Sequence, residues 1–198
     1  MYKRLFLLLF AIATVITSKA QTADEMQNAY YDFNHAYVQH QYDQALSQAE
    51  KILPNIDKLS PKVQPNFYYL LGTIYEDASQ TTKAISCYEK VIVAVPNYFV
   101  AHRALGYIYL KEANQVAGKL NAAKTDVAEN KRLAALYIAT AKKAIPYLEK
   151  AQACDPDNDT LTRIKMLYKN TKNEEGLASL DSRLKTLSQN CVDLLNDK

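Results

Sequence analysis

The chain has 198 residues, among them 24 Lys and Arg, 21 Asp and Glu, 15 Tyr, four Gly and no Trp. Residues 1–20 hold three of the basic residues and none of the acidic ones, so the rest of the chain carries 21 of each sign. This balance excludes the overall basic footprint that nucleic-acid binding normally needs. With so few glycines and no sustained alternation of β-branched residues, the composition predicts one all-α domain over residues 21–198.

The N-terminus has the three parts of a secretory signal peptide. A short basic stretch precedes an apolar run over residues 5–16, and small residues at Ser18 and Ala20 fit cleavage after Ala20. The apolar run is shorter than the ~20 residues that a membrane-spanning helix needs, so an uncleaved anchor is the weaker alternative. We therefore expect an exported chain, periplasmic or extracellular, with no stable membrane span after cleavage.

Residues 24–57 are expected to form a first pair of helices. Asp24 is a candidate N-cap for a helix that runs to about His40, and a second helix runs from Tyr42 to about Leu53. The prolines that follow predict a loop.

The next two units, residues 61–96 and 97–156, share a pattern of large and small residues at helical spacing. The first contains Tyr68, Leu71, Gly72 and Tyr75, then Ala84 and Tyr88, and finally Pro96. The second contains Leu105, Gly106 and Tyr109, then Ala144 and Leu148, and finally Pro156. The two glycines are 34 residues apart, and each alanine lies 12 residues before its proline.

The small residues are expected where two antiparallel helices approach closely. Gly inside a helix costs roughly 1 kcal/mol relative to Ala, so Gly72 and Gly106 must be offset by tighter packing. The large residues form a stripe that fills the space between helices, and each proline ends the second helix of its pair. One amphipathic hairpin in an ordinary helical bundle is the alternative, and the repeat of the pattern argues against it.

Residues 111–141 are a helical insertion in the third unit. Tyr75 lies 9 residues before Ala84 in the second unit, whereas Tyr109 lies 35 residues before Ala144 in the third. Apolar residues recur every three or four positions through the insert, which predicts that both helices are lengthened, with a turn near residues 126–130. The hairpin then projects by roughly 20 Å at 1.5 Å per residue. A flexible loop hinged at Gly118 is the alternative.

The last unit, residues 158–198, is expected to be a partial repeat or a capping pair. Apolar spacings of three and four predict one helix from about Leu161 to Tyr168 and another from Leu177 to Leu194. The polar outer face of such a pair closes the end of a helical core.

The two central units resemble the tetratricopeptide repeat (TPR) family, whose 34-residue helix–turn–helix unit has the pattern W-x-x-L-G-x-x-Y…A-x-x-x-F…P. Tyr68 stands where the family has Trp, and Tyr88 where it has Phe. Residues 24–57 then form a degenerate first unit, with Phe33 where the glycine falls. The resemblance implies an antiparallel helix-pair solenoid over residues 21–198 with an extended third hairpin.

In this family the first helix of each unit lines a concave groove that binds a protein or a peptide. Carried over in register, the groove is lined by Tyr30, Asn34, Tyr37, Asn66, Tyr69, Thr73, Arg103, Tyr107 and Lys111. Tyrosine suits recognition because it gives a large contact area and a hydroxyl at low entropic cost. The alternative is that some of these tyrosines fill gaps between units, since the chain has no Trp.

No set of residues in the sequence fits an active site, a metal site or a cofactor. His35 and His40 are five residues apart, which does not stack them on one helix face for a metal, and His102 is expected to be a packed ring. The acidic stretch 155–159 lacks the Gly and the distal Glu of a calcium loop. We expect a protein with no enzymatic activity, no metal and no cofactor.

The cysteines, Cys87, Cys154 and Cys191, are odd in number for an exported chain. Small buried thiols are the favoured interpretation. A Cys154–Cys191 bridge and an intermolecular bond through Cys191 are the alternatives.

These observations favour an adaptor or scaffold of the cell envelope that binds a protein or peptide partner through the groove, the projecting hairpin or both. One alternative is a protein that binds a small ligand or a glycan by stacking it on the groove tyrosines. The other is a structural component that forms a homo-oligomer through the hairpin.

Overall fold

The computed structural model describes residues 22–194, and this part of the chain is all-α, as the composition predicts. The helices are α1 (Ala23–Val38), α2 (Tyr42–Ile52), α3 (Val63–Asp77), α4 (Thr81–Ala94), α5 (Phe99–Ala122), α6 (Val127–Cys154), α7 (Asn158–Asn170), α8 (Glu174–Ala178) and α9 (Leu180–Leu187), with a 3₁₀ helix, η1 (Leu53–Lys58), after α2. No β-strand occurs within residues 22–194; an isolated parallel bridge joins Tyr98 and Val192. The predicted signal peptide, residues 1–20, lies outside the described range.

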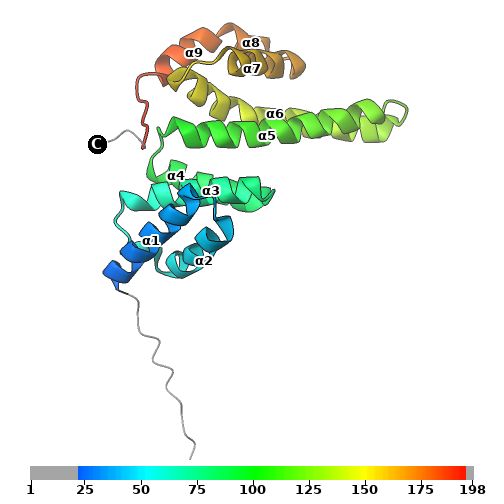
Figure 1. Ribbon diagram of the computed structural model, residues 1–198. Helices are drawn as coiled ribbons and strands as arrows, with labels where there is room; N and C mark the ends of the chain where they lie inside the picture. Colours follow the sequence, from blue (N-terminus) through cyan, green and yellow to red (C-terminus); the bar gives the residue numbers. More distant parts are fainter. Residues whose placement is uncertain (1–21, 195–198) are drawn as a thin grey trace, which may run out of the picture.

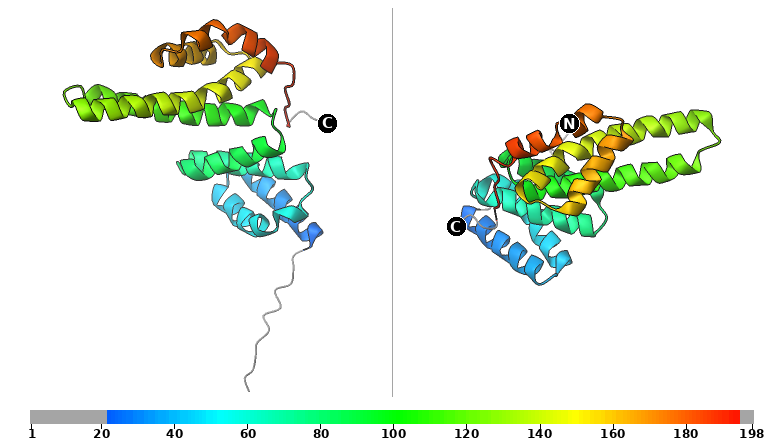
Figure 2. Two further views of the ribbon diagram at one scale, coloured as in Figure 1. Left: turned by 180° about the vertical axis from the view of Figure 1, so that it is seen from behind. Right: turned by 90° about the horizontal axis from the view of Figure 1, so that it is seen from above.

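Successive helices form hairpins that stack in chain order (Figure 1). The most extensive contacts join α1 to α2, α3 to α4, and α5 to α6. The pair α3–α4 lies between the other two pairs, and α7–α9 cover the opposite side of α5–α6 (Figures 1 and 2).

Three of the turns between helices have the same backbone geometry. His40, Ser79 and Lys172, which follow α1, α3 and α7, have positive φ values of 56°, 58° and 54°. Each donates its amide to the carbonyl three residues earlier, and the next residue donates to the carbonyl five residues earlier. This is the Schellman ending of a helix. The same device therefore reverses the chain in three helix pairs, although none of the three residues is glycine.

The two glycines of the repeated pattern lie where helices touch. A Cβ atom on Gly72 would be 2.6 Å from Tyr88 Cε1, and one on Gly106 would be 2.7 Å from Leu148 Cδ2 and 3.0 Å from the Leu148 backbone nitrogen. These distances are shorter than real Cβ contacts, so α3 meets α4, and α5 meets α6, only because these positions lack a side chain.

The remaining positions of the pattern differ in how much of each residue is exposed to solvent. Leu71, Ala84, Tyr88, Leu105, Ala144 and Leu148 have no exposed surface, and Tyr109 is buried. Tyr75 is half-buried, whereas Pro96 and Pro156 are exposed in the turns after α4 and α6.

The core has two parts. One lies among α1–α4 and includes Phe33 and Phe67, whose ring centroids are 4.9 Å apart. The other lies among α4–α9. Tyr69, Tyr75 and Ile92 pack against both parts, so α3 and α4 connect them.

The third hairpin is built from two long helices, as its periodicity predicts. α5 has 24 residues and α6 has 28, whereas α3 has 15 and α4 has 14. Gly118 lies inside α5 with open space around it, so it is not the hinge of a loop. The turn occupies residues 123–126, earlier than the predicted 126–130, because Asp126 is the N-cap of α6 and accepts a hydrogen bond from the Glu129 amide at 3.0 Å.

The predicted final helix from Leu177 to Leu194 is confirmed only in its middle part, as α9, and both of its predicted ends are wrong. The chain breaks between α8 and α9 at Ser179, and it leaves helical geometry after Leu187. The cause is tertiary: Lys150 Nζ, on α6, donates to the Leu187 carbonyl at 3.0 Å and to the Asn190 carbonyl at 2.7 Å. The carbonyls that would continue the helix are thereby used elsewhere.

The favoured interpretation of the cysteines as free thiols holds only for Cys87, which is buried and unpaired. Cys154 and Cys191 form a disulfide across 37 residues, with their Cα atoms 5.5 Å apart. The bridge forms because α7, α8 and α9 bring the chain back to the end of α6.

A buried ion pair fixes α7–α9 on α6. The Glu149 carboxylate is 5% exposed and accepts from Arg183 Nη2 at 2.7 Å and from the Tyr168 hydroxyl at 2.6 Å. Arg183 also donates to the Gly176 carbonyl of α8 at 2.7 Å. One guanidinium therefore links α6, α7, α8 and α9.

Candidate functional site

Polar side chains of α1 and α3 meet in two matched contacts. The Asn66 amide donates to the Tyr30 hydroxyl at 3.0 Å, and the Thr73 and Tyr37 hydroxyls are hydrogen-bonded at 3.1 Å. The partners are 36 residues apart in both pairs. Tyr69 lies between Asn66 and Thr73 along α3. We call these five residues the tyrosine face.

The aromatic rings of this face pack against the protein. Tyr30 is 6% exposed. Tyr69 is half-buried, with its ring 5.4 Å from that of Tyr98 and 5.8 Å from that of Tyr88. Burial raises the pKa of the Tyr69 hydroxyl to about 12. Asn34, also predicted for the groove, is half-buried on α1. Part of the predicted groove thus serves to fill space between helices.

Two of the three predicted residues of α5 make their polar contacts with the α6–α7 turn and with α7. The Arg103 guanidinium is 2.8 Å from the Asp155 carboxylate in the turn before α7. Tyr107 is hydrogen-bonded to Thr160 of α7 at 2.7 Å, and Lys111 is exposed. The structure therefore brings the predicted residues together in two groups, one on α1–α3 and one on α5–α7.

The C-terminal segment Cys191–Leu194, which we call the tail, lies in non-helical form beside the α4–α5 connection. The Val192 amide donates to the Asn97 carbonyl at 3.0 Å, and the Phe99 amide donates to the Val192 carbonyl at 3.4 Å. The sequence does not predict this contact, because its only signals are an odd number of cysteines and the aliphatic Val192 and Leu194, which fit a helical period equally well.

Leu194 carries the tail to the tyrosine face. It packs against the α1–α4 core and lines a cavity of about 330 Å³ together with Tyr30 and Asn66. The other lining residues come from the start of α3 and the end of α4: Pro61, Lys62, Val63, Pro65, Ala94 and Val95. The Asn66 side-chain oxygen is buried and has no hydrogen-bond partner within residues 22–194. The cavity is therefore mostly apolar, with one lysine, Lys62, in its wall.

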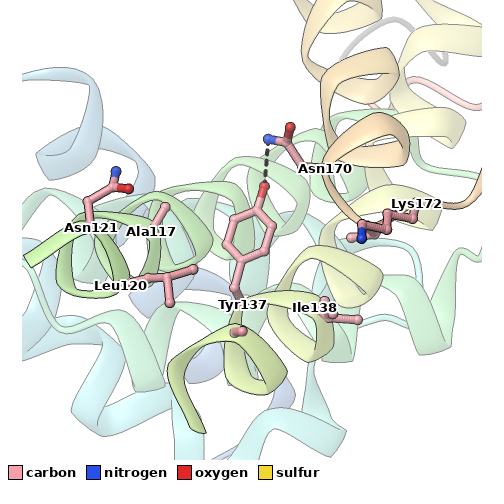
Figure 3. A pocket seen from close by; sticks show the side chains of 9 residues that line it. Ala117, Leu120, Asn121, Tyr137, Ile138, Asn170 and Lys172 are labelled. Atoms are coloured by element: carbon pink, nitrogen blue, oxygen red, sulfur yellow. Dashed lines mark hydrogen bonds between the residues drawn. The ribbon is translucent and has the colours of Figure 1, made fainter. Parts of the chain in front are cut away.

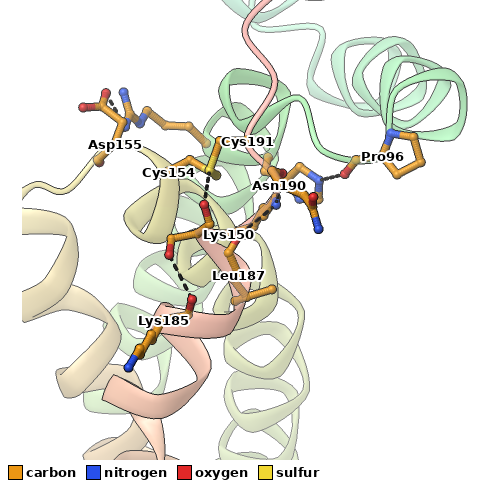
Figure 4. Close-up of a disulfide and its surroundings, with 11 residues drawn as sticks. Pro96, Lys150, Cys154, Asp155, Lys185, Leu187, Asn190 and Cys191 are labelled. Carbon is orange, nitrogen blue, oxygen red and sulfur yellow. Dashed lines mark hydrogen bonds and ion pairs between the residues drawn. A yellow bond between two sulfur atoms is a disulfide. The ribbon is translucent and has the colours of Figure 1, made fainter.

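The tail is fastened where it leaves α9 (Figure 4). The Cys154–Cys191 disulfide joins it to the end of α6, and Lys150 holds the Asn190 carbonyl. The neighbouring His102 donates its Nε2 hydrogen to the Pro96 carbonyl at 2.8 Å, directly before the segment that pairs with Val192. Burial lowers the pKa of His102. The expectation of a packed histidine ring is thus met, with a centroid distance of 5.7 Å to Tyr147.

A second cavity, of about 540 Å³, lies between the projecting hairpin and the end of α7 (Figure 3). Tyr137 of α6 stands in it and accepts a hydrogen bond from the Asn170 amide at 3.0 Å. Leu120, Ile138 and Lys172 lie around this ring. Most of the lining residues belong to the insertion, residues 111–141, and the others to the end of α7 and the turn after it.

Two further observations concern residues 22–194. None of the helices in this range combines the length and apolar character that a membrane crossing requires. No three His, Cys, Asp or Glu side chains in this range are grouped in a way that would hold a metal ion.

Comparison with known proteins identifies one relative. No family profile matches the chain, and no solved structure does. In an alignment of 129 residues that covers 58% of this chain and 72% of the relative, the sequence is 30% identical to the "Uncharacterized protein ycf37" of Guillardia theta. The extent of this similarity shows that the chain belongs to the ycf37 family.

Proposed function

We propose that the chain is an exported, non-enzymatic adaptor of TPR-like architecture that binds an extended peptide segment of a partner protein along the tyrosine face. The TPR-like architecture is supported by the 34-residue recurrence of Leu-Gly-x-x-Tyr, by the close contacts at Gly72 and Gly106, and by the common turn after α1, α3 and α7.

One observation carries the peptide-binding proposal. The tail already lies beside this face as an extended peptide would, with two backbone hydrogen bonds and an aliphatic side chain at a cavity. Main-chain pairing gives affinity in such complexes, and a pocket for one side chain gives specificity.

Export is supported by the disulfide. Structural disulfides form and persist in oxidising compartments and are rare in reducing ones. The Cys154–Cys191 bridge and the N-terminal pattern of residues 1–20 point to the same location.

The geometry favours a peptide over a glycan. Stacking on a sugar needs an open aromatic ring face, but Tyr30 is buried and Tyr37, Tyr69 and Tyr107 are each half-buried. A peptide needs backbone partners and an apolar pocket, which the α4–α5 connection and the cavity beside Asn66 supply.

Selection from a displayed library of random peptides tests the proposal. The bait is the full chain after residue 20 with Cys191→Ser, and each selected peptide is measured against Lys62→Glu and Lys51→Glu forms of that bait. Both lysines are exposed, but only Lys62 lines the cavity. We expect peptides whose affinity falls at least about fivefold with Lys62→Glu and stays unchanged with Lys51→Glu. Peptides equally sensitive to both changes, or no enrichment, would contradict the proposal.

A further inference from the structure

The strongest unexplained feature of the molecule is that its own tail, Cys191–Leu194, lies on the proposed binding site. We propose that the tail competes with the partner for the tyrosine face. The partner segment then has the same order of residues as the tail, an aliphatic residue, an acidic residue and a leucine. The Cys154–Cys191 disulfide holds the tail in place. This inference rests on the proposed function, because it assigns the ligand class and the control of the same face.

The tail's own contacts indicate the chemistry of the segment that replaces it. Val192 contributes its backbone, through the bridge to residues 97–99. Leu194 contributes an aliphatic side chain against Tyr30 and the other apolar residues of the cavity wall. An incoming peptide that keeps both features therefore has an extended backbone and a leucine two residues after the paired position.

The charge of the site favours an acidic residue between these two. Asp193 occupies that position in the tail, and Lys62 supplies a cation in the cavity wall. Burial raises the pKa of Tyr69 and Tyr98, and the Asp193 carboxylate adds to the rise in both. Asp193 therefore lies near these two rings.

The cavity is not filled by the tail. A space of about 330 Å³ remains with Leu194 in its wall, and most of the other lining residues are apolar. A partner segment that enters more deeply than Leu194 therefore gains apolar contact.

The fastening of the tail lies outside the face. The disulfide and Lys150 act on residues 187–191, whereas the rest of the tail is held by noncovalent contacts, which include two backbone hydrogen bonds and the packing of Leu194. Such a short contact depends on the high effective concentration that a tether provides. Cys191 is exposed. A dithiol reductant that meets the bridge becomes a disulfide, and its two electrons and two protons convert Cys154 and Cys191 to thiols. The tail is then tied to the molecule only through α9.

Fluorescence anisotropy with a labelled peptide tests the inference. The peptide has the sequence of residues 190–198 with Ser in place of Cys191, and the protein is the full chain after residue 20. If the tail covers the face in about nine oxidised molecules of ten, the apparent Kd is raised about tenfold. We therefore expect the oxidised wild-type chain to bind about tenfold more weakly than Cys191→Ser, and dithiothreitol to remove this difference.

Three controls make the result decisive. Dithiothreitol must leave the affinity of Cys191→Ser unchanged, a peptide with Asp in place of its first Leu must not bind, and circular dichroism must show an unchanged helix content. Leu194→Asp, which keeps the disulfide, must also strengthen binding of the peptide, so the inference is tested even if Cys191→Ser does not fold.

The possible failures are distinguishable. Equal affinity of the oxidised, reduced and Leu194→Asp chains overturns the inference but leaves peptide binding intact. Binding of library peptides without binding of the tail peptide overturns the assigned ligand class. No binding of either kind of peptide by any form overturns the proposed function as well.

Discussion

Gly106 and Gly118 are the same residue type on the same helix, yet their surroundings are opposite. A Cβ on Gly106 meets the side chain and backbone of Leu148, whereas nothing lies within 4 Å of a Cβ on Gly118. We expect Gly106→Ala to destabilise the chain by about 1–3 kcal/mol through overpacking, and Gly118→Ala to stabilise it by about 0.5–1 kcal/mol through helix propensity. Urea unfolding of both variants checks this; equal effects would contradict the close approach of α5 and α6.

Ser79 gives a second prediction, because it adopts a left-handed conformation that costs a non-glycine residue about 1–2 kcal/mol. Ser79 is exposed, so Ser79→Gly removes this cost without disturbing a buried contact. We expect a gain in stability of up to about 1 kcal/mol, since glycine also makes the unfolded chain more flexible. Ser79→Val must lower the thermal midpoint; if it raises it, the turn after α3 is not the one described.

His102 predicts a dependence on pH. Its Nε2 hydrogen is donated to the Pro96 carbonyl, and its other ring nitrogen is buried without a partner in the described chain. Burial lowers the pKa of the ring, and Lys150 adds to this. The unfolded chain therefore binds a proton near pH 6.5 that the folded chain binds only at lower pH, so stability falls as the pH drops through 6.5.

His102→Gln keeps an N–H donor for the Pro96 carbonyl and cannot be protonated. We expect urea midpoints at pH 5.5 and 7.5 to differ more for the wild-type chain than for this variant. A wild-type midpoint that rises toward pH 5.5 relative to that of the variant would show that the sign is wrong.

At the scale of elements, the sequence was sufficient to predict those helices that depend on interactions between residues close together in the chain. Apolar residues every three or four positions predicted α5 and α6 through the insertion, because that period belongs to one helix and needs no knowledge of the rest of the fold. The turn was placed a few residues late, since the N-cap role of Asp126 depends on a single side-chain contact with the Glu129 amide.

The sequence was insufficient to predict the end of the fold, because contacts between residues far apart in the chain determine it. Leucines at helical spacing continue to Leu194. The helix nevertheless ends at Leu187, because Lys150 donates hydrogen bonds to the Leu187 and Asn190 carbonyls and Cys154 forms a disulfide with Cys191. The same contacts place the tail on the tyrosine face. The residues of that face could be predicted from the TPR-like repeat pattern. The position of the tail beside them could not, because it depends on how α7–α9 fold back on α6.

The hairpin formed by α5 and α6 provides a prediction at this scale. Leu136 and Ile138 are 42% and 37% exposed on α6, near the cavity around Tyr137. If the hairpin is the contact of a homo-oligomer, Leu136→Glu with Ile138→Glu must shift the mass measured by light scattering to that of a monomer. The matched control is Val93→Glu, an exposed position on α4. A mass that changes with neither variant excludes this part of the hairpin as the contact.

At the scale of the whole molecule, the two parts of the core give different responses to reduction. The disulfide closes a loop across 37 residues, and a loop of this size restricts the unfolded chain by about 3–4 kcal/mol. That loop contains α7, α8 and α9, whereas the core among α1–α4 lies outside it. The stability lost on reduction must therefore be concentrated in the C-terminal elements.

We expect Cys154→Ser with Cys191→Ser, or reduction of the wild-type chain, to speed hydrogen exchange in α7–α9 and at the Val192 and Phe99 amides, while amides of α1–α3 keep their protection. Tyr69, Tyr75 and Ile92 connect the two parts of the core, so the alternative is one cooperative unit in which protection falls everywhere at once. Only the local response leaves the tyrosine face folded while it is uncovered. Hydrogen exchange thus decides whether the same bridge that stabilises α7–α9 can also control access to the tyrosine face.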